Sequence, residues 1–553
     1  MNLLALLSKP GIDTGVVEKL STVLSTVGGK RPNKKTMRKR ALAVLGELEK
    51  TRGLEPAVRT MLLMTGADTF MPPQYGRFQK VVFEGAVFFI SNLPRARIAD
   101  KMVSQLVLPQ DTPAGKRMCD LVTNLPTLQK LCQIICRSPG LDPGFKSALI
   151  DLEDNSTSVT YRTLRATIEK ELNSSGQDLT LSRKILAEAS VCAVVPGVLN
   201  EKKGEEAIPL VMKMVKPAIK RNMAGELALW GRLGDYLDDN KELWGLGNFQ
   251  FRGIIDQVSR LLQNEVDLSL EQLNLDRAGA CFAGDDTVII PEPLEASTPN
   301  MTVMTRVDGK KITDVAHLTG KEQRRIARKV TEACILRPIV DLSKESLFHG
   351  DPHAGNMAYR FDGRSPELIF YDWGMVGRLS RLERFSVMLM IAGLAMKNEK
   401  AVYWAVDIMS GGQVTKGRVP KKKVKSIIAV SIASREKRLK GVLSSVEGLI
   451  EELMYLGVVF SSGLLVFEKS LVTLKGVLAD IDPEFSRDEY VVWNAVLQLA
   501  GDFAHMRIQK MIISELWGLY RHSMGVLFDI QRSILRFGLE LVNVRRLRKR
   551  YTD

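Results

Sequence analysis

The stretch His349-Gly-Asp-Pro-His-Ala-Gly-Asn356, followed by Tyr371-Asp-Trp-Gly374, constrains this chain more than any other. It has the pattern H-G-D-x-x-x-x-N followed by D-x-G. In kinase-type phosphoryl-transfer sites, one aspartate of such a pattern orients the attacking group, and an asparagine and a second aspartate hold Mg²⁺ on the nucleotide phosphates. The order of the whole string therefore predicts a site of this kind.

The spacing inside this stretch adds a geometric prediction. Residues 357–361 and 367–371 are short apolar runs typical of strands, and residues 362–366 have the composition of a turn. In a hairpin symmetric about Arg364, Asn356 faces Asp372. Directly opposed side chains lie about 5 Å apart, so both could bind one Mg²⁺, which usually takes further oxygens from substrate phosphates. The alternative is a solvated hairpin whose Asp and Asn residues only favour the turn.

Length and composition set the class of protein. A chain of 553 residues with 45% hydrophobic and 25% charged residues is expected to be globular, with more than one domain. Its six cysteines (119, 132, 136, 192, 281 and 334) form no C-x-x-C pair. This scatter argues against a zinc site or a disulfide scaffold and favours a reducing compartment.

The formal net charge of +15 is concentrated in residues 30–40, 416–425, 435–440 and 545–550. Such basic runs can bind anionic membranes or nucleic acid, or they can be solvated faces that aid solubility. No interleaved aromatics or nucleic-acid-binding module accompanies them, so no nucleic acid is expected as a partner.

Targeting and membrane-spanning segments are not evident in the sequence. Residues 1–7 are apolar but lack a basic region and are too short for a signal peptide. The longest apolar run, residues 455–467, is too short to span a bilayer and is expected to be a buried helix. We therefore expect an intracellular protein, either cytoplasmic or peripheral to a membrane, and leave open a transit peptide and the organelle.

A lysine in a predicted strand is the next candidate. Residues 1–180 have the pattern of helices, after which residues 186–195 and 208–215 are typical of two strands, with a turn beginning at Pro196-Gly197. Lys213 lies inside the second apolar run. A buried ammonium needs an anion, and in kinase folds such a lysine grips the nucleotide phosphates while pairing with a helix glutamate. The alternative is a lysine on the outer face of the strand.

The candidate glutamate lies in residues 251–275, which are predicted to form one long helix. Val266, Leu270 and Leu273 form an apolar stripe at i, i+4, i+7, and Asp267, Glu271 and Asn274 form a parallel polar stripe. Glu265 lies on the other flank. A carboxylate facing the site would lie beside the buried face, although an ordinary polar flank would have the same pattern.

Taken in order, these segments resemble the UbiB/AarF/ADCK family of atypical protein-kinase-like proteins over about residues 180–400. The family has an Ala-rich loop, a strand V-A-V-K-V-Q-R-P, a helix E-x-D-x-x-x-E-A-x-N, then H-G-D-x-H-P-G-N and D-x-G. The corresponding segments are residues 188–195, 211–217, 265–274, 349–356 and 371–374.

The resemblance implies an α+β, atypical protein-kinase-like bilobal fold. It would comprise a small β-containing N-lobe (181–310) and a helical C-lobe core (311–400), with helical extensions at 1–180 and 401–553. The resemblance also implies ATP and Mg²⁺ as ligands. By position, the implied site residues are Asp351 in the catalytic loop, Asn356 and Asp372 on Mg²⁺, Lys213 with Glu265 or Glu271 as its partner, and Ala189 and Ser190 over the phosphates.

The chain departs from the family pattern in three places. The K-x-G-Q motif, associated in the family with covering the active site and blocking protein substrates, is absent. Cys192-Ala193 and Val195 replace the usual Gly-Gln and His of the Ala-rich loop, and the hinge at 304–309 lacks the usual Glu-Tyr. These changes lie on the side that covers the nucleotide, while the metal-binding motifs are intact.

Three functions are compatible with the sequence. The resemblance implies an atypical kinase or ATPase tied to isoprenoid-quinone (ubiquinone) biosynthesis and lipid handling at membranes, with an anionic membrane surface or lipid- and quinone-pathway proteins as partners. A catalytically weak nucleotide-binding scaffold is the first alternative. A small-molecule phosphotransferase of the aminoglycoside or choline kinase type is the second; the 265–274 helix motif and His353 favour the family resemblance over it.

Overall fold

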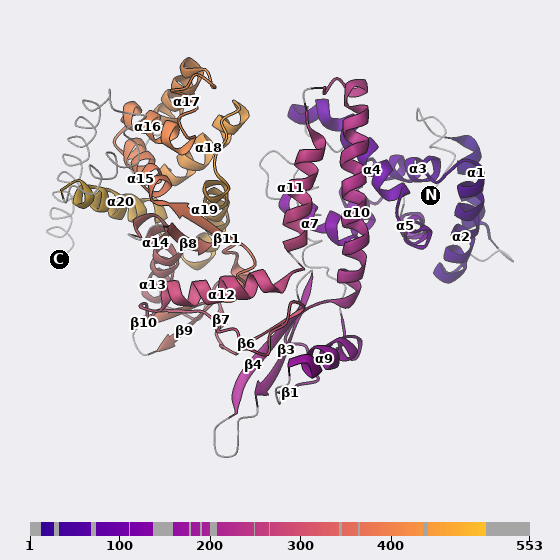
Figure 1. The fold of residues 1–553 in the computed structure, drawn as a ribbon, viewed down its shortest axis with the longest axis horizontal. Coiled ribbons are helices and arrows are strands. Elements are labelled where there is room, and N and C mark those ends of the chain that lie inside the picture. The colour runs from indigo at the N-terminus through magenta and orange to yellow at the C-terminus, as the bar shows by residue number, and fades with distance from the viewer. Residues whose placement is uncertain are drawn as a thin grey trace. The chain divides into compact units, whose positions relative to one another are not determined.

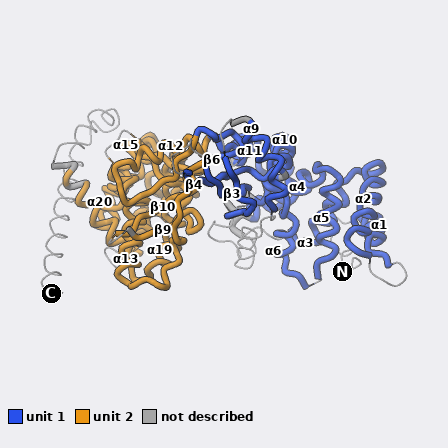
Figure 2. The backbone as a smooth tube through the Cα atoms, turned by 90° about the horizontal axis from the view of Figure 1, so that it is seen from below, with its two compact units in different colours: residues 1–269, 295–303 blue, residues 270–294, 304–553 orange. Residues whose placement is uncertain are grey.

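The computed structural model describes most of the chain and divides it into two compact units. The described residues are 13–26, 32–67, 73–109, 111–135, 159–175, 179–188, 191–199, 207–247, 249–264, 266–341, 345–362, 365–434 and 441–504. Unit 1 comprises residues 1–269 and 295–303, and unit 2 comprises residues 270–294 and 304–553 (Figure 2). The domain boundaries expected from the sequence stay a prediction.

Unit 1 is mainly helical, with one sheet (Figure 1). Its helices are α1 (Thr14–Leu24), α2 (Lys34–Thr51), α3 (Glu55–Thr65), η3 (Pro73–Phe78), α4 (Gln79–Ser91), α5 (Arg95–Val107), α6 (Ala114–Val122), α7 (Pro126–Ile135), α9 (Tyr161–Ser175), α10 (Pro217–Asn240), η4 (Lys241–Trp244) and α11 (Phe251–Asn264). Its strands are β1 (Leu179–Leu181), β2 (Ala187–Glu188), β3 (Cys192–Leu199), β4 (Ile208–Val215) and the first part of β6 (Met301–Thr305).

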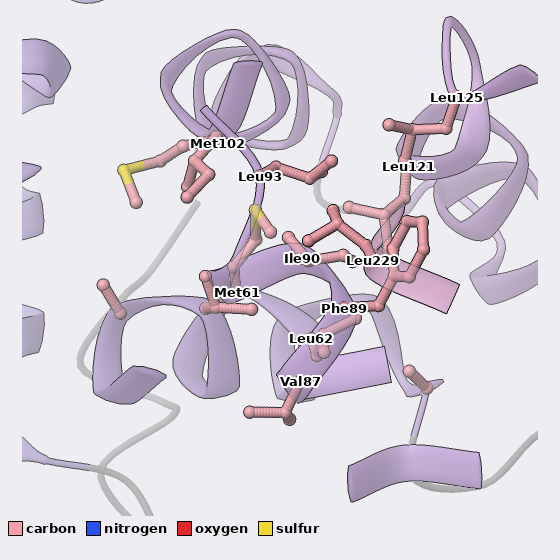
Figure 3. Close-up of a cluster of buried hydrophobic side chains, with 14 of the residues drawn as sticks. Met61, Leu62, Val87, Phe89, Ile90, Leu93, Met102, Leu121, Leu125 and Leu229 are labelled. Carbon is pink, nitrogen blue, oxygen red and sulfur yellow. The ribbon is translucent and has the colours of Figure 1, made fainter. Parts of the chain in front are cut away.

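One hydrophobic core joins the N-terminal helices to the long helix α10. Met61 of α3, Phe89 of α4 and Leu229 of α10 belong to the same buried cluster (Figure 3). Glu226 of α10 is fully buried, and its carboxylate accepts hydrogen bonds from the backbone N–H and the hydroxyl of Thr127, at 3.0 and 2.6 Å. The helices before residue 135 are thus packed onto an element of the expected N-lobe.

The sheet of unit 1 has the order β1-β3-β4-β6, with β2 beside β3. The turn expected at Pro196-Gly197 is wrong, because both residues lie within β3 and pair with Val211 and Leu210 of β4. Glycine is required here by a close approach: a Cβ at position 197 would lie 2.8 Å from the Thr180 carbonyl oxygen of β1.

Unit 2 combines helices with two small sheets. Its helices are α12 (Leu268–Phe282), α13 (Gly320–Thr331), the π-helical η5 (Glu332–Leu336), α14 (Arg337–Val340), η6 (Ala354–Asn356), α15 (Arg381–Ala395), α16 (Glu399–Met409), α17 (Lys421–Ala433), α18 (Val442–Tyr455), α19 (Ser462–Ile481) and α20 (Arg487–Ala504). Its strands are β5 (Val288–Ile289), β7 (Lys310–Lys311), β8 (Glu345–His349), β9 (Met357–Asp362), β10 (Ser365–Phe370) and β11 (Val376–Ser380). One sheet has the order β5-β10-β9-β7, and β8 pairs with β11 in the other. The α+β class expected from the sequence is confirmed.

The β9–β10 hairpin is present, but its register differs from the prediction by one residue. Asp362 pairs with Ser365 and Met357 with Phe370, so two residues rather than the expected five connect the strands. Two-residue connections suit the natural twist of paired strands. The backbone carbonyl of Asn356 accepts the N–H of Tyr371 at 3.0 Å, so Asn356 lies opposite Tyr371 and not Asp372.

The single helix expected over residues 251–275 is wrong as well. α11 ends at Asn264 and α12 begins at Leu268. The side chain of Asp267 accepts the backbone N–H of Ser269 at 2.9 Å, as residues at the start of a helix commonly do. Asp267 therefore stabilises a new helix start within the predicted helix.

The apolar run 455–467 is divided between two helices instead of forming one buried helix. Gly457, with a positive φ of 97°, follows the end of α18, and the Ser461 hydroxyl caps α19 by accepting the N–H of Leu464. Tyr455 and Val459 are 64% and 68% exposed. None of the helices in the described part of the chain has the length and apolarity that a membrane crossing requires.

Candidate functional site

The loop that follows β8 is closed by its own polar side chains. The backbone N–H of Asp351 donates to Nδ1 of His349 at 3.2 Å, and Nδ2 of Asn356 donates to the Asp351 carbonyl at 3.2 Å. The N–H of Gly355 donates to Nδ1 of His353 at 3.0 Å, where η6 begins. Asp351 and Asn356 are therefore held at the two ends of one compact loop.

His349 is a structural member of this loop. Its ring is 4% exposed and lies 4.9 Å from the ring of Trp373 and 5.8 Å from that of Phe370, centroid to centroid. Burial lowers the pKa of His349 to about 4, although the Asp372 and Asp351 carboxylates act in the opposite direction. The ring is therefore neutral at physiological pH and can accept the Asp351 N–H.

Asp372 follows β10 and lies on the neighbouring stretch of backbone. Its Oδ1 accepts the N–H of Gly374 at 2.9 Å, which fixes the side chain against the D-x-G turn. The hydrogen bond from Tyr371 N–H to the Asn356 carbonyl places the two candidate metal ligands on adjacent backbone segments. The structure therefore brings Asp351, Asn356 and Asp372 to one site, although the predicted direct opposition of Asn356 and Asp372 is wrong.

Helix α12 supports the D-x-G turn with buried polar residues. Glu271 and Asn274 are 3% and 1% exposed, and Asn274 Nδ2 donates to the Trp373 carbonyl at 3.0 Å. The predicted apolar stripe faces outward instead: Leu270 and Leu273 are 36% and 43% exposed. In α12, Glu271 and Asn274 are thus buried in place of the two leucines.

The residues present fit a magnesium nucleotide. No group of three or more His, Cys, Asp or Glu side chains suited to a metal occurs among the described residues. Asn356 and Asp372 together offer two kinds of oxygen ligand, and the amide nitrogen of Asn356 is already used by the Asp351 carbonyl. Mg²⁺ is commonly held by one or two protein oxygens with substrate phosphates and water completing its shell, and when bound it neutralises phosphate charge.

In unit 1, β4 contains one buried lysine. Lys213 is 9% exposed and pairs in register with Val194 of β3, so its strand position and burial agree with the expectation. Its pairing with Glu271, which belongs to the other unit, stays a prediction. Glu265, Ala189 and Ser190 lie outside the described residues.

A second lysine of this segment was not singled out from the sequence. Lys216, at the end of β4, is 1% exposed, and its Nζ lies 3.3 Å from Oε2 of Glu188 in β2. Both oxygens of the Glu188 carboxylate also accept the N–H of Val159, at 3.2 Å. The only sequence indication was a lysine directly after an apolar strand and directly before Pro217, where α10 begins.

Comparison with known proteins decides the family. The profile of the ABC1 atypical kinase-like domain matches residues 151–406. Its matched segment contains the strand lysine, the α12 polar residues, the catalytic-type loop and the D-x-G turn described above. The expected resemblance of this segment to the UbiB/AarF/ADCK family of atypical kinase-like proteins is confirmed.

Relatives with this family's names align over much of the chain. A probable protein kinase UbiB of Cellvibrio japonicus is 27% identical over 305 residues, covering 53% of each chain. Protein ACTIVITY OF BC1 COMPLEX KINASE 7, chloroplastic, of Arabidopsis thaliana is 24% identical over 366 residues, covering 65% of this chain and 51% of the relative. An uncharacterized protein of Synechocystis is 22% identical, covering 65% and 60%. The chain thus spans between about half and three fifths of the length of these relatives.

A solved structure also shows similarity. A Mycobacterium tuberculosis protein in complex with erythromycin aligns with a TM-score of 0.42 and 15% sequence identity. The alignment covers 65% of this chain and 87% of the other.

The departures from the UbiB/AarF/ADCK loop pattern are buried in this structure. Cys192, Ala193 and Val195 are 5%, 0% and 0% exposed and belong to β3. Cys192 is a member of the hydrophobic core of unit 1. These replacements contribute packing to the sheet of unit 1.

Proposed function

We propose that this protein binds Mg-ATP and acts as an atypical kinase or ATPase. The observation that carries the proposal is the loop in which His349, Asp351 and Asn356 are joined by hydrogen bonds, with Asp372 on the adjacent backbone. This arrangement supports an aspartate at the acceptor side and two oxygen ligands at the metal side, as phosphoryl transfer requires. Lys213, with Glu265 or Glu271 as its partner, is proposed for the nucleotide side.

Each residue has a distinct role in this proposal. Asn356 and Asp372 would hold Mg²⁺ on the nucleotide phosphates, and Lys213 would bind the α- and β-phosphates. Asp351 would orient the acceptor oxygen and take its proton. Preorganised groups of this kind contribute more than groups that must reorganise during the reaction, and the closed loop supports such preorganisation.

Nucleotide binding is tested by thermal melting with and without Mg-ATP. Mg-ATP at about 100 times its Kd should stabilise the wild type by about 2.7 kcal/mol. Asp372→Asn should remove the shift, because an amide is a weaker metal ligand than a carboxylate. Asp480→Asn, on the exposed end of α19, is the matched control and should keep the shift. An unchanged shift in Asp372→Asn would end the metal-ligand assignment.

Turnover distinguishes an enzyme from a scaffold. We would measure phosphate release from ATP by the purified wild type and by Asp351→Asn. The comparison tests whether turnover requires the Asp351 carboxylate. Wild-type activity that is lost in the variant supports the kinase or ATPase proposal. Mg-ATP binding without turnover would support the catalytically weak scaffold, for which the altered loop around Cys192 is the favouring observation.

We further propose that the protein works at an anionic membrane surface, in support of isoprenoid-quinone or lipid metabolism. Lys416 and Arg418 are exposed in the loop before α17, and the side chain of Gln413 in that loop exchanges two hydrogen bonds with the backbone of Val459, at 2.8 and 3.1 Å. Exposed Val459 therefore lies beside the loop that carries these basic residues. Basic and apolar side chains on one surface support binding to a lipid interface.

A further inference from the structure

Helix α19 is packed directly against the loop that carries Asp351. The ring of Phe467 lies 5.6 Å from that of Phe348 in β8, centroid to centroid. A Cβ at Gly350 would lie 2.8 Å from Val466 Cγ1, and a Cβ at Gly463 would collide with the Arg378 carbonyl oxygen of β11. Glycines at these two positions allow the helix to approach the loop so closely that its side chains reach the site.

One of those side chains is Lys469. Its Nζ lies 3.2 Å from Oδ1 of Asp351 and 3.1 Å from Sδ of Met375, the residue after the D-x-G turn. The loop itself, from Pro352 to Gly355, contains no lysine or arginine. A positive charge beside Asp351 therefore comes from a helix far along the chain.

The ion pair contributes little to folding. The side chains of Lys469 and Asp351 are 30% and 20% exposed. Pairs that water reaches typically contribute no more than about 1 kcal/mol to stability, because solvent screens them and the lysine loses side-chain freedom. The helix is held by its glycines and aromatic contacts instead. Replacing Lys469 should therefore leave the fold intact.

We propose that Lys469 is a positioning residue for phosphoryl transfer. The inference rests on the proposed function: the bond from the γ-phosphorus to ADP breaks, a bond to the acceptor oxygen forms, and the acceptor proton passes to Asp351. Lys469 holds the Asp351 carboxylate in the orientation that accepts this proton. It also places a positive charge beside the oxygens on which negative charge is redistributed during transfer.

The test is a split between turnover and binding in matched variants. Lys469→Met should lower kcat for ATP turnover by about 10- to 100-fold, because a misplaced catalytic group costs this much. The KM for ATP and the Mg-ATP melting shift should stay within about twofold of wild type, because Lys469 acts on the acceptor-side carboxylate of Asp351. Lys469→Arg should recover part of kcat, since it restores the charge. Lys475→Met, two turns away on the same helix, should match wild type.

A second measurement does not depend on turnover. A paired lysine stays protonated and reacts slowly with an acetylating reagent, so Asp351→Asn should raise the acetylation rate of Lys469, measured by mass spectrometry, relative to Lys475. An unchanged rate, or a kcat of Lys469→Met that equals or exceeds that of wild type, would overturn the proposal. If the wild type does not turn over ATP, both the catalytic function and the role of Lys469 are rejected. If the wild type is active but the Lys469 predictions fail, only the role of Lys469 is rejected.

Discussion

Buried charges show most clearly how single residues shape this protein. Lys216 is 1% exposed and its Nζ lies 3.3 Å from the Glu188 carboxylate, which is itself about one fifth exposed. A buried ammonium is costly unless a carboxylate compensates it. The pair connects the short strand β2, just before the loop expected over the phosphates, to the end of β4.

The two partners of this pair should respond unequally to substitution. Glu188→Gln removes the carboxylate charge 3.3 Å from the buried Lys216 ammonium and should cost about 3 kcal/mol of unfolding free energy. Lys216→Met should cost clearly less, because the remaining carboxylate can still be hydrated. Urea unfolding of both variants measures the difference. Equal losses, or a greater loss in Lys216→Met, would contradict this account.

Site residues that share a local pattern could be predicted, and residues joined only by tertiary contact could not. Asp351, Asn356 and Asp372 follow a fixed spacing, and the structure brings them together. Glu188 and Lys216 meet across two strands, and Lys469 reaches Asp351 from another helix, without any local periodicity that marks either contact. Roles in catalysis stay predictions for all of them.

At the scale of elements, hydrophobic patterns predicted the strands and helices better than their ends and faces. The strands β4, β9 and β10 lie close to their predicted ranges, and α2, α9, α16 and α17 lie in segments expected to be helical. The break before α12 was missed because Asp267 was interpreted as part of a polar stripe and not as a helix start. The α12 face was assigned wrongly because buried Asn274 bonds a carbonyl that the sequence could not place.

Helix α19 depends on one glycine for its position. Gly463→Ala would place a methyl group on the Arg378 carbonyl oxygen and should cost about 2–3 kcal/mol, because neither backbone can yield easily. Turnover should fall as well, since the helix carries Lys469. Gly476→Ala, on the same helix with open space around it, should be neutral or stabilising by up to about 1 kcal/mol. Urea unfolding midpoints of the two variants measure the difference. Similar midpoints for both would refute the packing argument.

At the scale of the whole molecule, the main feature is positive charge on exposed residues. The net charge is +15, and the described basic residues 416–425 accompany exposed Tyr455 and Val459. The basic segments 435–440 and 545–550, and the first two residues of 30–40, lie outside the described residues. A surface of this kind should bind anionic lipid mainly through charge, with a contribution of about 1 kcal/mol for each basic residue near the surface.

Vesicle flotation tests the membrane proposal. Vesicles containing phosphatidylserine should carry the protein, and vesicles of phosphatidylcholine alone should not. Binding should weaken between low salt and 0.5 M NaCl, because the screening length falls from about 10 Å at 0.1 M to a few ångströms. Lys421, Lys422 and Lys423 changed together to Gln should reduce flotation without changing the melting temperature. Binding that is the same with and without anionic lipid, and at low and high salt, would count against the proposal.

The contact between α19 and the loop also bears on where this enzyme-like unit ends. The family profile stops at residue 406, yet Phe467, Val466 and Lys469 touch β8 and the loop that follows it. A shortened chain that stops with the recognised domain would expose the Phe348 ring and leave Asp351 without its lysine. The family match and the packed structure around Asp351 therefore end at different residues. Fragments intended for biochemistry should include α19.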